Sequence, residues 1–378
     1  MSALDLQSWL LTQGRRCSTV DSLLSGFAPM LQEAARVDRL WLGTTVLHPQ
    51  AAAYGWIWGP EGGEAFEFSH DRFAILDAED SPLARLRDGA PSLRVRRGDP
   101  SAAPLDDLRA LFSEGYTDFY AEPLHFCGVW AGGFTWSTRH PEGFSDGDIL
   151  TLKGIVPALS AVVEPLARDR MYSTLMRTYL GRDAGQRVLA GQVRRGDGQS
   201  VRAAIWFSDV RGFTKMSQEL ARPTLLALLD VIFQDVVDAV RRSGGQVLKF
   251  MGDGALATFA FDDDPGGERA CAAATQAAED LQRRLAARRA AGAGELASVG
   301  VGLHYGDLTY GNIGARGRLD FTVIGESVNL AARVEGLCSR TGETVLATDA
   351  VASRSPGWRE FDSFDVKGVG EPVGVWRR

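Results

Sequence analysis

Two acidic residues, Asp209 and Asp253, stand where apolar strands are expected to end. Asp209 follows the apolar run Ala203–Phe207 and precedes a tight turn at Gly212 that opens into a helix. Asp253 lies in the sequence Gly-Asp-Gly at the tip of an expected hairpin. Two carboxylates at strand ends suit a pair of divalent cations that grip a nucleoside triphosphate.

The turn after Asp209 also carries groups that can approach phosphates. Gly212 lets the backbone come close, and the amides of the helix start at Phe213 and Thr214 can cradle a phosphate. The alternative is that both aspartates are unrelated turn residues, since Asp-Gly is a common hairpin turn. The other motifs of the C-terminal half favour the metal interpretation.

The bulk properties indicate two or three domains in a chain of 378 residues. The net charge of -7 argues against nucleic acid as a main partner. The 4 cysteines are scattered, which indicates reduced thiols and excludes a clustered zinc motif. The start lacks a signal-peptide pattern, and no apolar stretch approaches the ~20 residues of a bilayer span. We therefore expect a soluble, cytoplasmic protein without a membrane span.

The first region, residues 1–164, has the pattern of an α+β domain. Apolar residues recur at helical spacing from Val20 to Ala34 and again from Leu152 to Leu166. Short strand-like segments lie between them, at 40–46, 54–58, 121–129 and 133–137. Helices that bracket an antiparallel sheet predict a domain of the size of a sensor.

The second region, residues 165–198, is expected to be a helical connector. Pro165 should break or kink the preceding helix. Met171, Leu175 and Tyr179 then form a narrow apolar stripe, which suits a seam between two helices of a dimer. Packing of this helix on its own domain is an equal alternative.

The third region, residues 199–378, alternates strands and helices and predicts an α/β sandwich. Apolar residues from Leu225 to Val240 mark a long helix. The other expected elements are a hairpin at 246–259, a helix at 267–290, a strand at 298–304, a hairpin at 312–324 and a helix from Glu326.

This third region resembles the catalytic domain of class III nucleotidyl cyclases over roughly 180 residues. Four segments carry the resemblance in the right order and spacing: 207–214, 249–254, 321–333 and 367–369. The resemblance implies that Asp209 and Asp253 bind two Mg²⁺ or Mn²⁺ ions per site, with Val210 as a further metal ligand. One ion would activate the ribose hydroxyl and the other would neutralise the triphosphate.

The same resemblance gives roles to three further residues. Asn329 and Arg333 are four apart and so lie on one helix face. By resemblance, Asn329 orients the ribose and Arg333 stabilises charge on the α-phosphate in the transition state. Lys367 matches the lysine that binds the terminal phosphates. The alternative for the helix pair is an ordinary solvated face.

Two residues bear on the choice of base. Adenine offers an acceptor at N1 and a donor at N6, whereas guanine reverses both. Lys249 can only donate and Thr322 can accept, so the pair matches adenine. Guanylate cyclases of this family carry an acidic residue at the lysine position. Many relatives have Asp where Thr322 stands.

The resemblance also implies a site assembled between two chains. The metal ligands come from one subunit, and the adenine pair with Asn329 and Arg333 comes from the other. Because one chain carries every part, we expect a homodimer with two equivalent sites.

The end of the first region, from Gly128 through Trp136 to Ser145, resembles a GAF-type sensor domain. This resemblance allows an unknown small-molecule ligand. The aromatic residues Trp56, Trp58, Phe119, Tyr120, Trp130 and Trp136 either line its pocket or form core, and core is the commoner role of aromatics in strands.

The expected fold is therefore α+β with two domains, a GAF-like antiparallel sheet with flanking helices and a C-terminal α/β sandwich. The expected activity is an adenylate cyclase that uses ATP and is regulated by its N-terminal domain. The alternatives are a guanylate cyclase and a catalytically weak ligand-sensing module.

Overall fold

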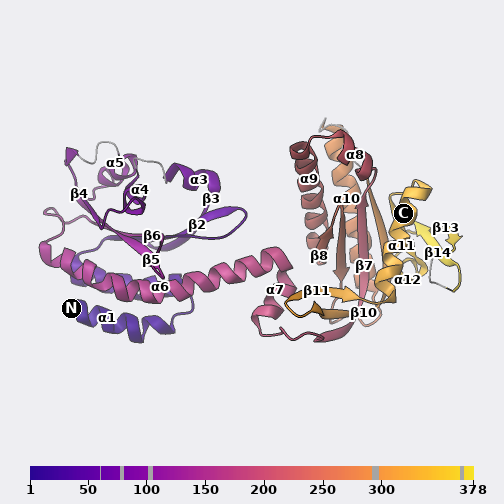
Figure 1. Ribbon diagram of the computed structural model, residues 1–378, viewed down its shortest axis with the longest axis horizontal. Coiled ribbons are helices and arrows are strands. Elements are labelled where there is room, and N and C mark those ends of the chain that lie inside the picture. The colour runs from indigo at the N-terminus through magenta and orange to yellow at the C-terminus, as the bar shows by residue number, and fades with distance from the viewer. Residues whose placement is uncertain (60, 77–80, 101–104, 292–297, 367–369) are drawn as a thin grey trace. The chain divides into compact units, whose positions relative to one another are not determined.

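The computed structural model describes residues 1–59, 61–76, 81–100, 105–291, 298–366 and 370–378. The chain divides into two compact units, Met1–Leu175 and Met176–Arg378 (Figure 1). Each unit has its own sheet, helices and buried core. The expectation of a mixed α and β structure with two sheets therefore agrees with the structure.

The first unit contains a six-stranded antiparallel sheet in the order β3-β2-β1-β6-β5-β4. The strands are β1 (Arg39–Thr45), β2 (Ala51–Gly59), β3 (Gly62–Ser69), β4 (Leu93–Arg96), β5 (Asp118–Phe126) and β6 (Val129–Thr138). Side chains alternate between the two faces of each strand. Leu40 and Leu42 of β1 join the main core on one face, and Trp41 between them points to the other.

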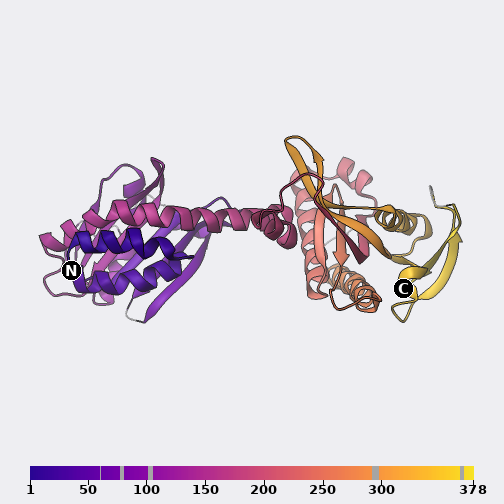
Figure 2. The same cartoon turned by 90° about the horizontal axis from the view of Figure 1, so that it is seen from below.

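Helices cover both faces of this sheet. Residues of α1 (Ala3–Thr12), α2 (Val20–Ala35) and α6 (Asp146–Leu180) form the main core with one face, and Figure 2 shows these helices lying along one another. The other face carries α3 (His70–Leu76), α4 (Pro82–Arg87) and α5 (Asp106–Ser113). Leu86, Leu108 and Leu111 from α4 and α5 form a second, smaller core there.

Helix α6 continues through Pro165, so of the two expected effects of this residue, a break or a kink, the break is wrong. It is also long and apolar enough to cross a membrane by length and composition, with a hydropathy of 1.5 over 18 residues. The core helix of a soluble protein meets the same criterion. Leu152, Ile155 and Leu159 of α6 are fully buried in the first core, although only 28% of the apolar stretch as a whole is buried.

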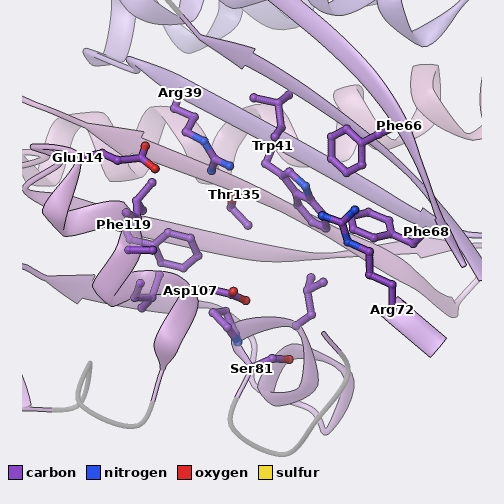
Figure 3. Close-up of a pocket in the computed structure, with 16 residues that line it drawn as sticks. Arg39, Trp41, Phe66, Phe68, Arg72, Ser81, Asp107, Glu114, Phe119 and Thr135 are labelled. Carbon is purple, nitrogen blue, oxygen red and sulfur yellow. The ribbon is translucent and has the colours of Figure 1, made fainter. Parts of the chain in front are cut away.

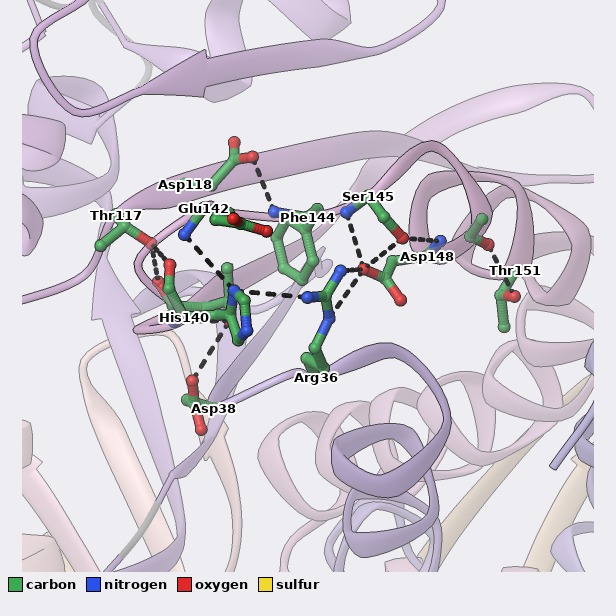
Figure 4. Close-up of polar contacts among 12 residues, drawn as sticks. Arg36, Asp38, Thr117, Asp118, His140, Glu142, Phe144, Ser145, Asp148 and Thr151 are labelled. Carbon is green, nitrogen blue, oxygen red and sulfur yellow. Dashed lines mark hydrogen bonds and ion pairs between the residues drawn. The ribbon is translucent and has the colours of Figure 1, made fainter.

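A polar network fixes the beginning of α6 (Figure 4). Arg36, which ends α2 in the left-handed conformation at φ 54°, binds Asp148 through its Nε at 3.0 Å. The Ser145 amide donates to the Asp148 carboxylate at 2.7 Å, and the Asp148 amide donates to the Ser145 hydroxyl at 3.2 Å. The end of α2 and the first turn of α6 are therefore tied by charged hydrogen bonds.

The second unit has an eight-stranded mixed sheet in the order β13-β14-β12-β10-β7-β9-β8, with β11 also paired to β10. The strands are β7 (Gly198–Val210), β8 (Gln246–Met251), β9 (Gly254–Phe259), β10 (Val299–Ala315), β11 (Arg318–Ile324), β12 (Val345–Thr348), β13 (Arg359–Phe364) and β14 (Val373–Arg377). The central strands β7 and β10 pair over thirteen residue positions, from Val299↔Val210 to Gly311↔Gly198.

Helices lie on both faces of this second sheet as well, which makes the predicted sandwich (Figure 1). One face packs on α9 (Arg222–Arg242) and α10 (Glu268–Ala290), and the other packs on α11 (Glu326–Thr341). The remaining helices are α7 (Arg182–Leu189), α8 (Phe213–Glu219) and α12 (Asp349–Ala352). The expected elements of the third region are all present, and β10 is much longer than the predicted strand.

Candidate active site

Asp209 lies one residue before the end of β7, as the sequence predicts. The alternation of β7 decides which face it occupies. Trp206 and Val210 belong to the core beneath α9 and α10, whereas Ala203 and Ile205 belong to the core beneath α11. Asp209 therefore projects on the α11 face of the sheet and remains open to solvent.

Asp253 occupies the turn between β8 and β9, beside the end of β7. Ser208 pairs with Ala255, and a Cβ on Gly254 would come within 3.2 Å of the Asp209 Oδ1 atom. The two carboxyl groups are therefore neighbours. Partial burial, and then the charge of Asp253, raise the pKa of Asp209 to about 6.

This carboxylate pair has the chemistry of a divalent cation site. Two oxygen ligands that repel each other as anions gain from a cation between them, and hard oxygen donors suit Mg²⁺ or Mn²⁺. The amide of Val210 donates to the Asp209 carboxylate, which places Val210 beside the pair. Among the described residues no group of three or more His, Cys, Asp or Glu side chains could hold a metal, so substrate oxygens would have to complete the coordination.

The turn after β7 matches the prediction in detail. Gly212 has φ +71°, a conformation that glycine adopts without strain, and it directly precedes α8. Phe213 and Thr214 begin that helix, so their amides lie within its first turn. Unpaired amides at this position can receive phosphate oxygens.

Asn329 and Arg333 lie one turn apart on α11, with Asn329 exposed and Arg333 partly exposed. Neither side chain makes a hydrogen bond or ion pair with the described residues. Both are therefore free to contact a substrate or a second chain. The structure places this helix on the same face of the sheet as Asp209.

The two residues assigned to the base lie on different strands. Lys249 pairs with Leu256 of β9, which pairs with Phe207 of β7, so Lys249 shares the face of Asp209. Thr322 of β11 is buried, and its hydroxyl has no hydrogen-bond partner among the described residues. No hydrogen bond joins Lys249 to Thr322 in the described part of the chain. The predicted phosphate ligand Lys367 lies outside the described residues.

Two residues near the site were not identified from the sequence. Glu335 of α11 is close to Asp209 and Asp253, and burial followed by the charge of Asp209 raises its pKa to about 7. Arg211 donates to the carbonyls of Cys338 at 2.9 Å and Gly342 at 3.2 Å. Arg211 therefore ties the turn after Asp209 to the C-terminal end of α11. An acid two residues after Arg333 was the only sequence signal for Glu335.

Comparison with known proteins agrees with this fold. Residues 198–371 match the family described as the adenylate and guanylate cyclase catalytic domain. An adenylate cyclase of Anabaena cylindrica is 31% identical over 185 residues, which cover 46% of this chain and 36% of that protein. Adenylate cyclase 1 of Rhizobium meliloti is 32% identical over 157 residues, covering 41% of this chain and 24% of that protein.

A solved structure of a bacterial light-regulated adenylyl cyclase has a TM-score of 0.50 at 22% identity and covers 59% of this chain and 63% of its own. This similarity shows the fold. The chain spans only about a quarter to a third of the length of the two curated cyclases. Residues 198–371 are thus a class III adenylate/guanylate cyclase catalytic domain.

Proposed function

We propose that this protein converts ATP into cyclic AMP and pyrophosphate. The proposal rests above all on the neighbouring carboxylates of Asp209 and Asp253 at the end of β7 and in the β8–β9 turn. In this reaction the ribose 3′-oxygen forms a bond to the α-phosphorus and the bond from that phosphorus to the bridging oxygen of pyrophosphate breaks. The hydroxyl proton passes to solvent.

Each residue of the proposed site would have a separate role in this reaction. Divalent cations held by Asp209 and Asp253 would supply charge neutralisation of the triphosphate and acidification of the hydroxyl. The amides at Phe213 and Thr214 would receive phosphate oxygens, and Lys367 would bind the terminal phosphates. Asn329 would orient the ribose and Arg333 would stabilise charge that develops on the α-phosphate.

A direct test of the metal pair replaces each carboxylate by its amide. Asp209→Asn and Asp253→Asn keep the shape of the side chain but remove the charge that holds a cation. We expect each to lower turnover roughly 100-fold or more, with an unchanged circular dichroism spectrum. Asp230→Asn, on the exposed side of α9, is the matched control and should be active. Retention of more than about a tenth of the activity in Asp209→Asn would refute the assignment.

The choice of ATP over GTP rests on Lys249, a donor on the same face as Asp209. A donor that faces guanine N1–H would leave both groups unpaired, at a cost of about 1–3 kcal/mol for each. Purified full-length protein should be assayed with ATP and with GTP, each with Mg²⁺ and with Mn²⁺. A higher kcat/KM for ATP is expected, and Lys249→Glu with Thr322→Cys should erode it. Equal values for both nucleotides in the unmodified protein would contradict the proposal.

Two observations support a site shared between two copies. Phe250, Met251 and Ile324, at the ends of β8 and β11, remain 45%, 39% and 50% exposed, so apolar side chains of the strands that carry Lys249 and Thr322 are available to a partner. Asn329 lies on α11 between Ala331, which approaches Gly302, and Ser327, which approaches Gly306.

Asp209 pairs with Gly300 of β10. Gly300 lies two to six residues before the stretch 302–306 that α11 approaches around Asn329, which is roughly 7–20 Å at the rise of a strand. Within one chain, Asn329 therefore lies away from the carboxylate pair of Asp209 and Asp253. Asp209→Ala and Arg333→Ala proteins, each inactive alone, should regain activity when mixed and allowed to exchange subunits. Inactive mixtures with verified heterodimers would refute the shared site.

We further propose that the N-terminal unit regulates the cyclase through α6. Arg170 stacks on the ring of Tyr54 at 4.1 Å, and Thr174 accepts from the Tyr54 hydroxyl at 3.3 Å, so α6 is held by the first unit almost to its boundary. The helix then continues to Leu180. A rotation of α6 would thereby reach the start of the second unit through one continuous helix.

Insertions after Met171 test this coupling. Two inserted alanines rotate the following helix by roughly 200°, whereas four restore the phase to within about 40°. The two-residue insertion should change the basal rate, and the four-residue insertion should bring it back toward the original. Equal rates in all three proteins would show that the first unit does not act through α6.

A further inference from the structure

A cavity of about 300 Å³ lies on the sheet of the first unit, on the face away from the main core (Figure 3). Its floor consists of the side chains that alternate away from that core: Arg39 and Trp41 of β1, Ile57 of β2, Phe119 of β5 and Thr135 of β6. Its walls come from α4 and α5. Of the six aromatic residues considered as pocket residues from the sequence, only Phe119 lines this cavity.

Two glycines leave room for aromatic rings on this face of the sheet. A Cβ on Gly43 would come within 2.2 Å of the Trp41 ring, so that ring lies over the glycine. A Cβ on Gly55 would likewise come within 2.4 Å of the Phe66 ring. Large aromatic faces laid along a sheet offer a surface on which a planar ring can stack.

The interior of the cavity contains unused hydrogen-bond donors. Thr135 is only 6% exposed, and its hydroxyl makes no hydrogen bond to any described residue. Arg39 is half-buried and forms no ion pair or side-chain hydrogen bond with the described residues, and burial lowers the pKa of its guanidinium. The charges of Glu114 and Asp107 act on Arg39 from a distance and partly offset the effect of burial, but no hydrogen-bonding anion contacts its guanidinium among the described residues. A half-buried guanidinium without such a direct contact is unfavourable, and a bound anion would relieve it. Figure 3 shows Arg39, Thr135 and Trp41 directed toward the same space.

The charged residues at the mouth of the cavity are exposed to solvent, unlike Arg39 and Thr135 inside it. Arg72, Asp107 and Glu114 are exposed, so water screens their charges. The buried donors should therefore decide the charge of the occupant. The aromatic floor should decide its shape.

From this geometry we infer that the cavity binds a small planar aromatic carboxylate. The carboxylate is received by the guanidinium of Arg39 and the hydroxyl of Thr135, and the ring lies on Trp41 and against Phe119. An apolar molecule without the anion would leave both donors unpaired. This site is independent of the cyclase residues, and its test does not use enzyme activity.

Isothermal titration calorimetry on the full-length protein can separate charge from shape. Cinnamate is a planar aromatic carboxylate, cinnamamide is its neutral counterpart, and cinnamylamine carries the opposite charge. We expect cinnamate to bind at least about tenfold more tightly than cinnamamide, and cinnamylamine not to bind. No binding of cinnamate, or equal binding of cinnamate and cinnamamide, would overturn the inference.

Arg39→Met should remove the preference for cinnamate, and Arg39→Lys should keep part of it. Arg15→Met, an exposed arginine of the same unit that does not line the cavity, is the matched control and should bind as the original does. Should Arg39→Met fail to fold, Thr135→Val removes one donor at nearly constant volume and should weaken the binding of cinnamate. The proposed site would be refuted if Arg39→Met kept the preference for cinnamate over cinnamamide. If Arg39→Met does not fold, an unchanged cinnamate affinity in Thr135→Val would refute it.

Discussion

Asp209 and Glu335 face each other from different elements, one at the end of β7 and the other in the middle of α11. Burial and the Asp209 charge together raise the pKa of Glu335 to about 7. Close approach of the helix makes this possible, since a Cβ on Gly300 would come within 2.7 Å of the Glu335 Oε1 atom. The proposed metal site therefore has a third acid behind its two carboxylates.

Replacing Glu335 by Gln should stabilise the metal-free protein at high pH. The folded-state pKa of Glu335 is raised, so the favourable contribution is present below its ordinary pKa of 4.5 and is lost as pH rises through about 7. Glu335→Gln should therefore melt at a higher temperature than the original at pH 8 in the presence of a chelator, and at a similar temperature near pH 4.5. Glu326→Gln in the first turn of α11 is the control and should show no such gain. A lower melting temperature of Glu335→Gln at pH 8 would contradict the prediction.

Arg211 should hold the end of α11 in place. Arg211→Met removes its hydrogen bonds to the carbonyls of Cys338 and Gly342 and leaves those groups without a charged donor. We expect the local opening free energy of the last α11 turn to fall by about 1–3 kcal/mol, measured by hydrogen exchange of peptides from this helix. Arg340→Met, an exposed arginine in the same turn, should change it little. Equal protection in both variants would show that the contact contributes nothing.

Asp235 should be the main ionic link between α9 and α10. It is 1% exposed and binds the Nε of Arg288 at 2.5 Å, with Arg284 at 3.6 Å. Asp235→Ala leaves two guanidinium groups without this partner, and should lower the stability of the helix pair by about 2–3 kcal/mol. Asp238→Ala, one turn away and 37% exposed, should cost less than about 1 kcal/mol. Hydrogen exchange in α9 and α10 measures both, and a larger loss for Asp238→Ala would reverse the assignment.

His304 should make the second unit sensitive to mild acid. Burial lowers the pKa of His304 to about 4, and its Nδ1 lies 2.8 Å from the Thr348 hydroxyl. The unfolded chain binds the proton more readily, so stability should fall as pH drops from about 6.5 toward 4. Urea unfolding at several pH values should show a shallower acid loss in His304→Gln than in the original. His125→Gln, at an exposed position, should leave the profile unchanged.

The sequence by itself determined the local parts of the candidate site. Each local pattern around the site predicts a backbone conformation that the structure shows. The apolar run before Asp209 forms β7, Gly212 begins the turn into α8, and the Gly-Asp-Gly sequence around Asp253 forms the β8–β9 turn. Hydrophobic periodicity and turn-forming residues act over a few residues, so the sequence alone was enough to predict these elements. The helical spacing of Asn329 and Arg333 was predictable for the same reason.

Only the tertiary structure decided what these parts meet. Glu335 is an ordinary helix residue until Gly300 and Gly302 let α11 approach β10 closely enough for its carboxyl to sense Asp209. Pro165 is expected from the sequence to break or kink a helix, yet α6 continues through it, because packing of α6 against the first core outweighs the lost hydrogen bond. The cavity beside Trp41 depends on which side chains of each strand lie on the same face of the sheet. That choice is set by the pairing of distant strands, which no local pattern encodes.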